Sequence, residues 1–197
     1  MRRAIIAVVA AVVLAGCADT PEDKKVEVGG KSSEPTPTPT ATKSSTGTLL
    51  DLVPPEPQRP ADARTKAGAI AFSDYVFKSI YYAYGTADPT PITDIADTAI
   101  CSGCKTPVNN ATTAGDNGRL LLGTQPVTTS DAKVTNVDGD IATVRLTVDY
   151  PQMVLVVADT KQAEGDRIKA VTEPTTVNLR WQGGKWVLLD FQPVKKK

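Results

Sequence analysis

The sequence predicts one α+β domain that follows a long N-terminal stretch too polar to fold. Two patterns lead to this prediction. Apolar residues recur at helical spacing over residues 65–84, whereas apolar and polar side chains alternate from Leu120 onward. Helices at the start of a domain and antiparallel strands after them are typical of the α+β class. We place the domain at residues 61–197.

The first 17 residues have the pattern of a secretory signal. Arg2-Arg3 precedes an apolar run over residues 4–14, which is shorter than the roughly 20 residues that a membrane-spanning helix needs. The run ends in Leu14-Ala15-Gly16-Cys17, which resembles the lipobox of bacterial lipoproteins. This resemblance implies a signal peptide over residues 1–16, cleavage between Gly16 and Cys17, and a lipid on Cys17. The alternative is an ordinary signal peptide or a short anchor that contains a cysteine.

Residues 17–60 are expected to form a disordered tether. The segment Pro35-Thr36-Pro37-Thr38-Pro39-Thr40 and its Ser-rich flanks offer too little apolar surface to offset the entropy of ordering them. A flexible chain of this length lets the domain sample the space above a membrane. We therefore expect a protein on the extracytoplasmic face of the cell membrane, held there by its lipid.

Three helices are expected before the strands. The first covers residues 65–84, with Asp62 or Thr65 as its cap. Its apolar residues form two stripes instead of one narrow face, which predicts a helix sunk into a concave surface. A short second helix is expected over residues 91–100. A weak third helix is expected over residues 107–114, where Asn and Thr lower the helix propensity.

Antiparallel strands are expected in the second half of the chain. Residues 143–150 alternate strictly, and they pair with residues 132–137 through the turn Asp138-Gly139-Asp140. The later elements are a strand buried on both faces over 153–157, a polar loop over 159–167, and two last strands joined by Gly183-Gly184. This order predicts a meander that closes the domain.

The chain carries 22 basic and 22 acidic residues and no histidine. Loss of Arg2 and Arg3 with the signal leaves 20 basic against 22 acidic residues, a net charge of −2, which does not favour nucleic acid as a partner. The lack of histidine excludes Ser-His-Asp and Cys-His catalysis and histidine-ligated metals. We expect no catalytic residue set, no metal site and no cofactor, although a desolvated carboxylate such as Asp74 or Asp88 could act as a base.

The segment Cys101-Ser102-Gly103-Cys104 has three interpretations. Lipidation of Cys17 leaves these two cysteines, and outside the cytoplasm two cysteines favour a structural disulfide. A redox-active pair would need a depressed thiolate pKa, usually at a helix that follows a strand. A zinc site would need two more ligands, and the chain has neither a histidine nor another cysteine pair.

Several segments together resemble an uncharacterised family of actinobacterial lipoproteins that is defined by a domain of unknown function. They are Thr65-Lys66-Ala67-Gly68-Ala69-Ile70-Ala71-Phe72, Tyr75, Tyr82-Ala83, Thr86-Ala87-Asp88 and the Cys-x-x-Cys. Ala87 stands where the family more often has glycine. The order of elements is similar to the nuclear-transport-factor-like or cystatin-like cone, in which a strongly curved antiparallel sheet wraps around the first helix. That cone implies a shape and not a function.

The expected function is non-enzymatic binding of a ligand or a protein. A cone can hold a lipid or another small hydrophobic ligand, and the residues expected to line such a pocket are Phe72, Tyr75, Tyr82, Trp181 and Trp186. The other interpretation is that these aromatic side chains fill the core. Expected partners are the membrane, an envelope protein and a small hydrophobic ligand. The alternative function is a thiol-disulfide oxidoreductase that uses Cys101 and Cys104.

Overall fold

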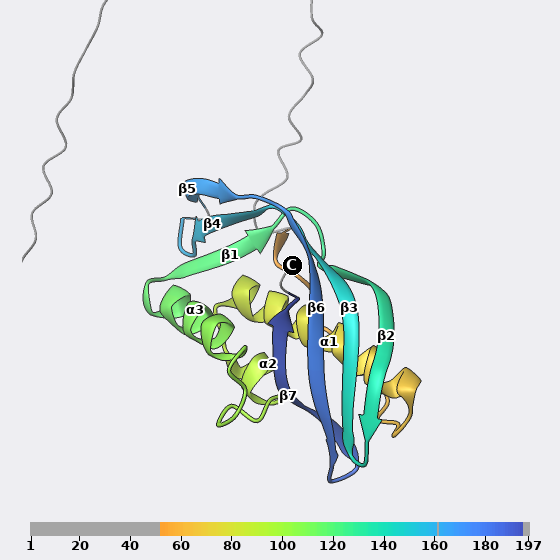
Figure 1. The fold of residues 1–197 in the computed structure, drawn as a ribbon. Helices are drawn as coiled ribbons and strands as arrows, with labels where there is room; N and C mark the ends of the chain where they lie inside the picture. Colours follow the sequence, from red (N-terminus) through yellow and green to blue (C-terminus); the bar gives the residue numbers. More distant parts are fainter. Residues whose placement is uncertain (1–51, 161, 195–197) are drawn as a thin grey trace, which may run out of the picture. The chain divides into compact units, whose positions relative to one another are not determined.

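The computed structural model describes residues 52–160 and 162–194; Cys17 and most of the expected tether lie outside them. Within the described residues, three helices and seven strands form two antiparallel sheets with helices against them (Figure 1). The α+β class predicted from the sequence is therefore confirmed. Residues 44–197 form one compact unit, which contains both apolar clusters of the domain and so has a core of its own, as an independently folding domain does.

Helix α1 (Lys66–Thr86) packs against strands of both sheets. The Thr65 hydroxyl caps its start by accepting a 3.0 Å hydrogen bond from the backbone N–H of Gly68. Its C-terminal cap is Ala87, which adopts the left-handed conformation at φ 54°. Most residues of both apolar stripes are buried, in agreement with the broad burial predicted for this helix; the buried residues are Ala69, Phe72, Val76, Phe77, Ile80, Tyr81 and Ala83.

The second helix is shorter than predicted. Helix α2 covers only Thr90–Thr93 instead of residues 91–100, because the chain beyond it bonds to the last strand. The backbone N–H of Asp97 donates to the carbonyl of Leu188 at 2.9 Å, and the Leu188 N–H donates to the carbonyl of Ile95 at 2.8 Å. The prediction of a longer helix was wrong because local spacing cannot reveal a distant strand that satisfies these backbone groups.

Helix α3 (Lys105–Asp116) is longer than the predicted 107–114 and packs against α1. Its buried residues are Pro107 and Ala111. The sequence of this helix is poor in strong helix formers, so its packing against the domain supplies the stability that propensity does not.

The larger sheet contains the strands β2 (Thr128–Asp138), β3 (Ile141–Tyr150), β6 (Val171–Gln182) and β7 (Lys185–Pro193), in the order β2-β3-β6-β7. Gly139 and the pair Gly183-Gly184 have positive φ, which permits the tight turns of its two outer hairpins. α1 lies against β2 and β3 (Figure 1). The core side chains of the sheet include Val144, Leu146, Val148, Val177, Leu179 and Leu188.

The smaller sheet contains β1 (Arg119–Gly123), β4 (Met153–Val157) and β5 (Ala163–Ile168), in the order β1-β4-β5. The prediction of a polar loop over 159–167 was therefore wrong for its second half, which pairs with β4. β5 is an edge strand with exposed side chains, so it lacks the apolar alternation that reveals a strand in a sequence.

The face of the smaller sheet turned away from α3 has its own apolar cluster. Leu122, Val154 and Val156 form this second cluster, and Leu52 and Val53 pack against it. The prediction that residues 153–157 are buried on both faces therefore holds only in part. Val154 and Val156 face this cluster and Met153 belongs to the main core, but Leu155 and Val157 are only partly buried.

The segment over residues 54–63 also lies on the domain, although the tether was expected to continue to residue 60. The ring of Pro54 sits so close to Gly85 that a Cβ there would clash with it. The guanidinium of Arg59 lies 4.8 Å from the centre of the Phe72 ring and donates to the carbonyl of Trp186 at 2.9 Å. These contacts make residues 54–63 part of the packed structure.

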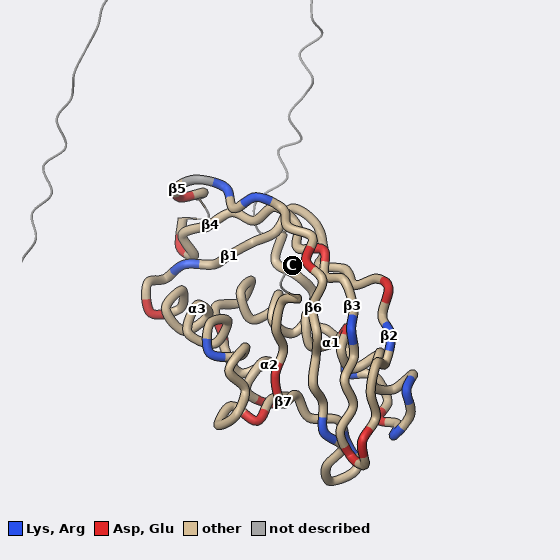
Figure 2. The backbone as a smooth tube through the Cα atoms, in the orientation of Figure 1, with Lys and Arg blue, Asp and Glu red and all other residues tan. Residues whose placement is uncertain are grey.

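Acidic and basic positions are interspersed over the domain (Figure 2). In the described part of the chain, no helix is long and apolar enough to cross a bilayer.

Candidate functional site

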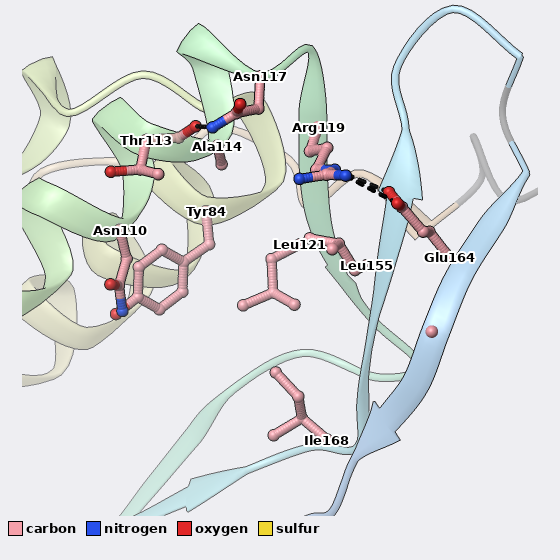
Figure 3. Close-up of a pocket in the computed structure, with 11 residues that line it drawn as sticks. Tyr84, Asn110, Thr113, Ala114, Asn117, Arg119, Leu121, Leu155, Glu164 and Ile168 are labelled. Carbon is pink, nitrogen blue, oxygen red and sulfur yellow. Dashed lines mark hydrogen bonds and ion pairs between the residues drawn. The ribbon is translucent and has the colours of Figure 1, made fainter. Parts of the chain in front are cut away.

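A groove of about 440 Å³ lies between α3 and the smaller sheet, beside the C-terminal end of α1 (Figure 3). Five elements contribute its walls, namely α1, α3, β1, β4 and β5. Pockets for small ligands typically measure about 300–1,000 Å³, so the groove has the size of a binding site. Its lining residues are Tyr84, Asn110, Thr113, Ala114, Asn117, Arg119, Leu121, Leu155, Glu164, Gly165 and Ile168.

The alternation of the strands supplies one wall of the groove. Arg119 and Leu121 on β1 face it, whereas Leu120 and Leu122 belong to the opposite face with the second cluster. On β4, Leu155 pairs with Leu121 on one side and with Glu164 of β5 on the other. The apolar centre of this wall is therefore flanked by one basic and one acidic side chain.

Arg119 and Glu164 form a bidentate ion pair across the smaller sheet (Figure 3). The Nε and Nη2 atoms of Arg119 donate to the two carboxylate oxygens of Glu164, each at 2.7 Å. The two side chains are 38% and 41% exposed, so water screens the pair and its net contribution to stability is small. Its clearer effect is to cancel the only two formal charges among the lining residues of the groove.

The helical wall carries neutral polar groups. Tyr84 from α1 and Asn110 from α3 lie side by side, with Thr113 one turn further along α3 (Figure 3). Burial raises the pKa of the Tyr84 phenol, and the Asn110 side chain offsets part of that rise. Tyr84 is therefore protonated at neutral pH and can donate or accept a hydrogen bond in the groove.

Tyr150 is the last residue of β3 and lies close to Tyr84. Burial raises its pKa beyond the ordinary range of a phenol, and the neighbouring Tyr84 and Glu173 raise it further because a second negative charge there would be repelled. The ring of Tyr150 packs edge-on against Phe77 in the main core, at 6.4 Å between centres. Tyr150 therefore stays protonated at neutral pH.

The lining residues of the groove combine hydrogen bonding with apolar contact. They include no cysteine, serine, lysine or histidine, the usual nucleophiles and bases apart from carboxylates. Within residues 52–160 and 162–194, no cluster of three or more His, Cys, Asp or Glu side chains could hold a metal ion. The groove thus offers hydrogen-bonding groups on its helical wall and apolar contacts on its sheet wall.

The five residues expected to line a pocket do not surround this groove. Phe72 and Trp186 are buried in the main core, and Trp181 packs edge-on against Trp186 at 5.2 Å between ring centres. Tyr75 and Tyr82 line a separate depression of about 260 Å³ beside α2. The reason is that α1 fills the concave face of the larger sheet with Phe72, Val76 and Phe77. The five residues thus have different surroundings in the described part of the chain, and Trp186 also borders a hollow of about 220 Å³ beside the start of α1.

One feature of the sequence does indicate the groove. Leu120-Leu121-Leu122 and residues 153–157 are both continuously apolar, and such runs must be covered on two faces. One face is covered by Leu52 and Val53. The other face is covered only in part, and its uncovered part, with Leu121 and Leu155, forms the wall of the groove.

Cys101 and Cys104 form a disulfide, with Cα atoms 5.3 Å apart. The two residues are 0% and 1% exposed. Their loop is docked on β7, where the Asp190 carboxylate accepts hydrogen bonds from the Gly103 backbone N–H at 2.7 Å and from the Ser102 hydroxyl at 3.1 Å. An external thiol would have to displace this loop before it could attack either sulfur, so the geometry favours a structural bridge.

The two carboxylates considered as bases both have local partners. The Asp74 carboxylate pairs with the Lys78 ammonium group at 2.6 Å, and the Asp88 carboxylate accepts a hydrogen bond from the Thr90 backbone N–H at 2.9 Å.

Comparison with protein families gives one match. The model of a family described as "Family of unknown function (DUF6318)" matches residues 53–192. Its first matched residue lies where the described chain begins to pack on the domain. No curated protein matches the sequence.

Three of the similar solved structures illustrate the range of these comparisons. An Ntf2-like protein involved in plasmid conjugation shares 12% identity over 66% of this chain and 48% of its own, with a TM-score of 0.40. A putative scytalone dehydratase from Novosphingobium aromaticivorans shares 11% identity over 61% of this chain and 80% of its own, with a TM-score of 0.41. A protein of unknown function with a cystatin-like fold from Nostoc punctiforme shares 13% identity over 60% and 84%, with a TM-score of 0.37.

Proposed function

The chain belongs to the family of unknown function DUF6318, and on that premise we propose that it is a lipid-anchored extracytoplasmic module that binds a small, largely apolar ligand without transforming it. The binding site in this proposal is the groove between α3 and the smaller sheet. The finer assignment of the domain to the nuclear-transport-factor-like cone is part of the same proposal, supported by the order of its elements and by the packing of α1 against β2 and β3.

The observation that carries the proposal is the groove of about 440 Å³ with its wall of Leu121, Leu155 and Ile168. Apolar side chains that remain in contact with water have not been used to stabilise the fold, and a ligand that covers them gains their burial energy. Ile168 is 47% exposed at this site. A non-catalytic role is further supported by the lack of histidine in the chain.

Binding can be tested with N-phenylnaphthylamine, an uncharged fluorescent probe, and the unit of residues 44–197. We expect the probe to bind the wild-type unit and its fluorescence to rise. Leu155→Trp fills the groove wall and should abolish this signal, whereas Ile100→Trp, at a residue 51% exposed elsewhere on the surface, should retain it. Cooperative thermal unfolding of both variants shows that they are folded. Equal probe binding by the two variants, or none by the wild type, would refute the proposal.

Anchoring rests on the resemblance of Leu14-Ala15-Gly16-Cys17 to a lipobox. We expect the full chain, made in a bacterial host, to lose residues 1–16 and to gain the mass of a diacylglyceryl group and a further fatty acid on Cys17. Cys17→Ala should remove these additions and leave the signal uncleaved. The measurement is intact mass after separation into detergent and aqueous phases. An unchanged mass in the Cys17→Ala variant would contradict the lipid anchor.

The alternative function, thiol-disulfide exchange by Cys101 and Cys104, has less support. Both residues are buried, and their loop is fixed by Asp190. Cys104 does stand at a helix start, as the N-cap residue of α3, but redox-active cysteines are also typically accessible, and these two are not. We therefore assign the pair a structural role in this proposal.

A further inference from the structure

We infer that the groove is selective for uncharged amphiphiles: molecules with an apolar body and a neutral hydroxyl, carbonyl or amide group. This inference rests on the proposed binding function and adds the chemical class of the ligand. It follows from three features of the groove, which are a cancelled pair of charges, a neutral polar wall and an apolar wall that faces it.

The first feature is the ion pair of Arg119 and Glu164. Both oxygens of the carboxylate are occupied by the guanidinium at 2.7 Å. An anionic ligand near Arg119 would also meet the negative charge of Glu164, and a cationic ligand near Glu164 would meet the positive charge of Arg119, so neither gains the attraction of an unpaired charge. The ion pair therefore disfavours charged ligands of either sign and costs a neutral ligand nothing.

The second feature is the helical wall. Tyr84 and Asn110 lie together there, and neither carries a charge at neutral pH. The phenol can donate or accept one hydrogen bond, and the amide offers both a donor and an acceptor. A charged group placed against this wall would be desolvated without a counterion, whereas a hydroxyl or carbonyl would exchange its water for equivalent partners.

The third feature is the position of the apolar side chains. Leu121 and Leu155 lie across the groove from Tyr84, and Ile168 lies at its edge (Figure 3). A ligand whose polar group contacts the helical wall would thus cover these three side chains with the rest of its body. The separation of polar and apolar walls selects an amphiphile over a molecule that is apolar throughout.

Three ten-carbon compounds with matched chains test the selectivity: decanol, decanoate and decylamine. The affinity of each compound is measured by its ability to displace N-phenylnaphthylamine from the unit of residues 44–197 at neutral pH. The compounds differ in water solubility, so the informative quantity is the change in their relative affinities between variants. Glu164→Gln frees the guanidinium of Arg119, and the affinity of decanoate relative to decanol should rise by about tenfold. Arg119→Gln should raise the relative affinity of decylamine by a similar factor.

Two matched controls separate these effects from general ones. Asp159→Asn changes the net charge by the same amount at an exposed residue outside the groove lining, and it should leave all ratios unchanged. Asn110→Ala should weaken decanol binding by about threefold to tenfold, whereas Asn109→Ala, on the neighbouring exposed position of α3, should not.

The outcomes distinguish this inference from the proposed function. If the probe binds but the ratios stay the same in Glu164→Gln and Arg119→Gln, the groove binds ligands without the inferred selectivity. If wild-type decanoate binds at least as tightly as decanol, the inference is also wrong. If neither the probe nor any compound binds, the proposed function itself fails.

Discussion

The backbone N–H of Gly103 donates a 2.7 Å hydrogen bond to the Oδ1 atom of Asp190, which joins the disulfide loop to the last strand of the larger sheet. The approach is close enough that a Cβ on residue 103 would clash with the carbonyl of Phe191. Glycine in the Cys-Ser-Gly-Cys segment is therefore required by this docking. This hydrogen bond fixes the disulfide loop, which lies directly before α3, to strand β7; we call this contact the joint.

Asp190→Ala should lower the free energy of unfolding by about 2 kcal/mol, because it removes a charged acceptor and leaves the Gly103 N–H and the Ser102 hydroxyl without this partner. Asp190→Asn keeps one acceptor oxygen and should lose less. Denaturant unfolding of residues 44–197 measures both, with Asp159→Ala as the exposed control. A loss of less than about 0.5 kcal/mol in Asp190→Ala would show that the joint is unimportant.

Replacing both Cys101 and Cys104 by Ala should lower the free energy of unfolding by about 2 kcal/mol, the loop-entropy value for so short a closed loop. Because Cys101 and Cys104 are buried, the wild-type disulfide should also resist reductant while the domain is folded. Alkylation and mass spectrometry at rising denaturant concentration can follow this. Reduction should track unfolding, and rapid reduction of the native domain would instead support a redox role.

Ala87→Gly should raise the free energy of unfolding by about 0.5–1 kcal/mol. Residue 87 holds φ at 54°, where an L-residue with a Cβ is strained, and this relief exceeds the entropy that glycine adds to the unfolded chain. Ala71→Gly is the matched control, because Ala71 is exposed inside α1 and its replacement should cost about 1 kcal/mol. The change in the free energy of unfolding, measured by thermal and denaturant unfolding, should therefore be positive for Ala87→Gly and negative for Ala71→Gly. The same sign for both variants would refute the explanation.

Stability should fall as the pH rises above about 10. Burial raises the pKa of Tyr84 and Tyr150 in the folded state, so the folded domain keeps phenol protons that the unfolded chain has released. Their contribution is complete below the unfolded pKa of about 10 and is lost as the pH rises through the folded pKa. Tyr84→Phe should reduce the alkaline slope by up to about 1.4 kcal/mol per pH unit. An identical slope in both proteins, measured by denaturant unfolding at several pH values, would contradict this.

The helical half was predictable where the signal is local. The cap of α1 at Thr65 and its broad burial follow from the residues themselves. The extent of α2 and α3 did not, because backbone bonds between Asp97 and Leu188 shorten the first and packing against α1 lengthens the second. Strand β5 escaped prediction because an exposed edge strand needs no apolar alternation.

The candidate site was the least predictable part. Phe72 and Trp186 were expected around a pocket because large aromatic side chains suit both cores and ligand sites, and composition cannot separate the two. The charges of Arg119 and Glu164 are 45 residues apart in the chain and meet only because β1, β4 and β5 lie in one sheet. No local pattern marks such a pair.

The sequence by itself determined the fold class, the pairing partners of the strict hairpin, the first helix and the absence of histidine chemistry, because each depends on periodicity or composition. The expectation of a lipid on Cys17 also comes from the sequence alone and remains a prediction. Only the tertiary structure decided where a groove remains open between the packed elements. Whether a buried face is filled or open depends on which side chains from distant segments reach it, and here α1 fills the larger sheet while α3 leaves a groove over the smaller one.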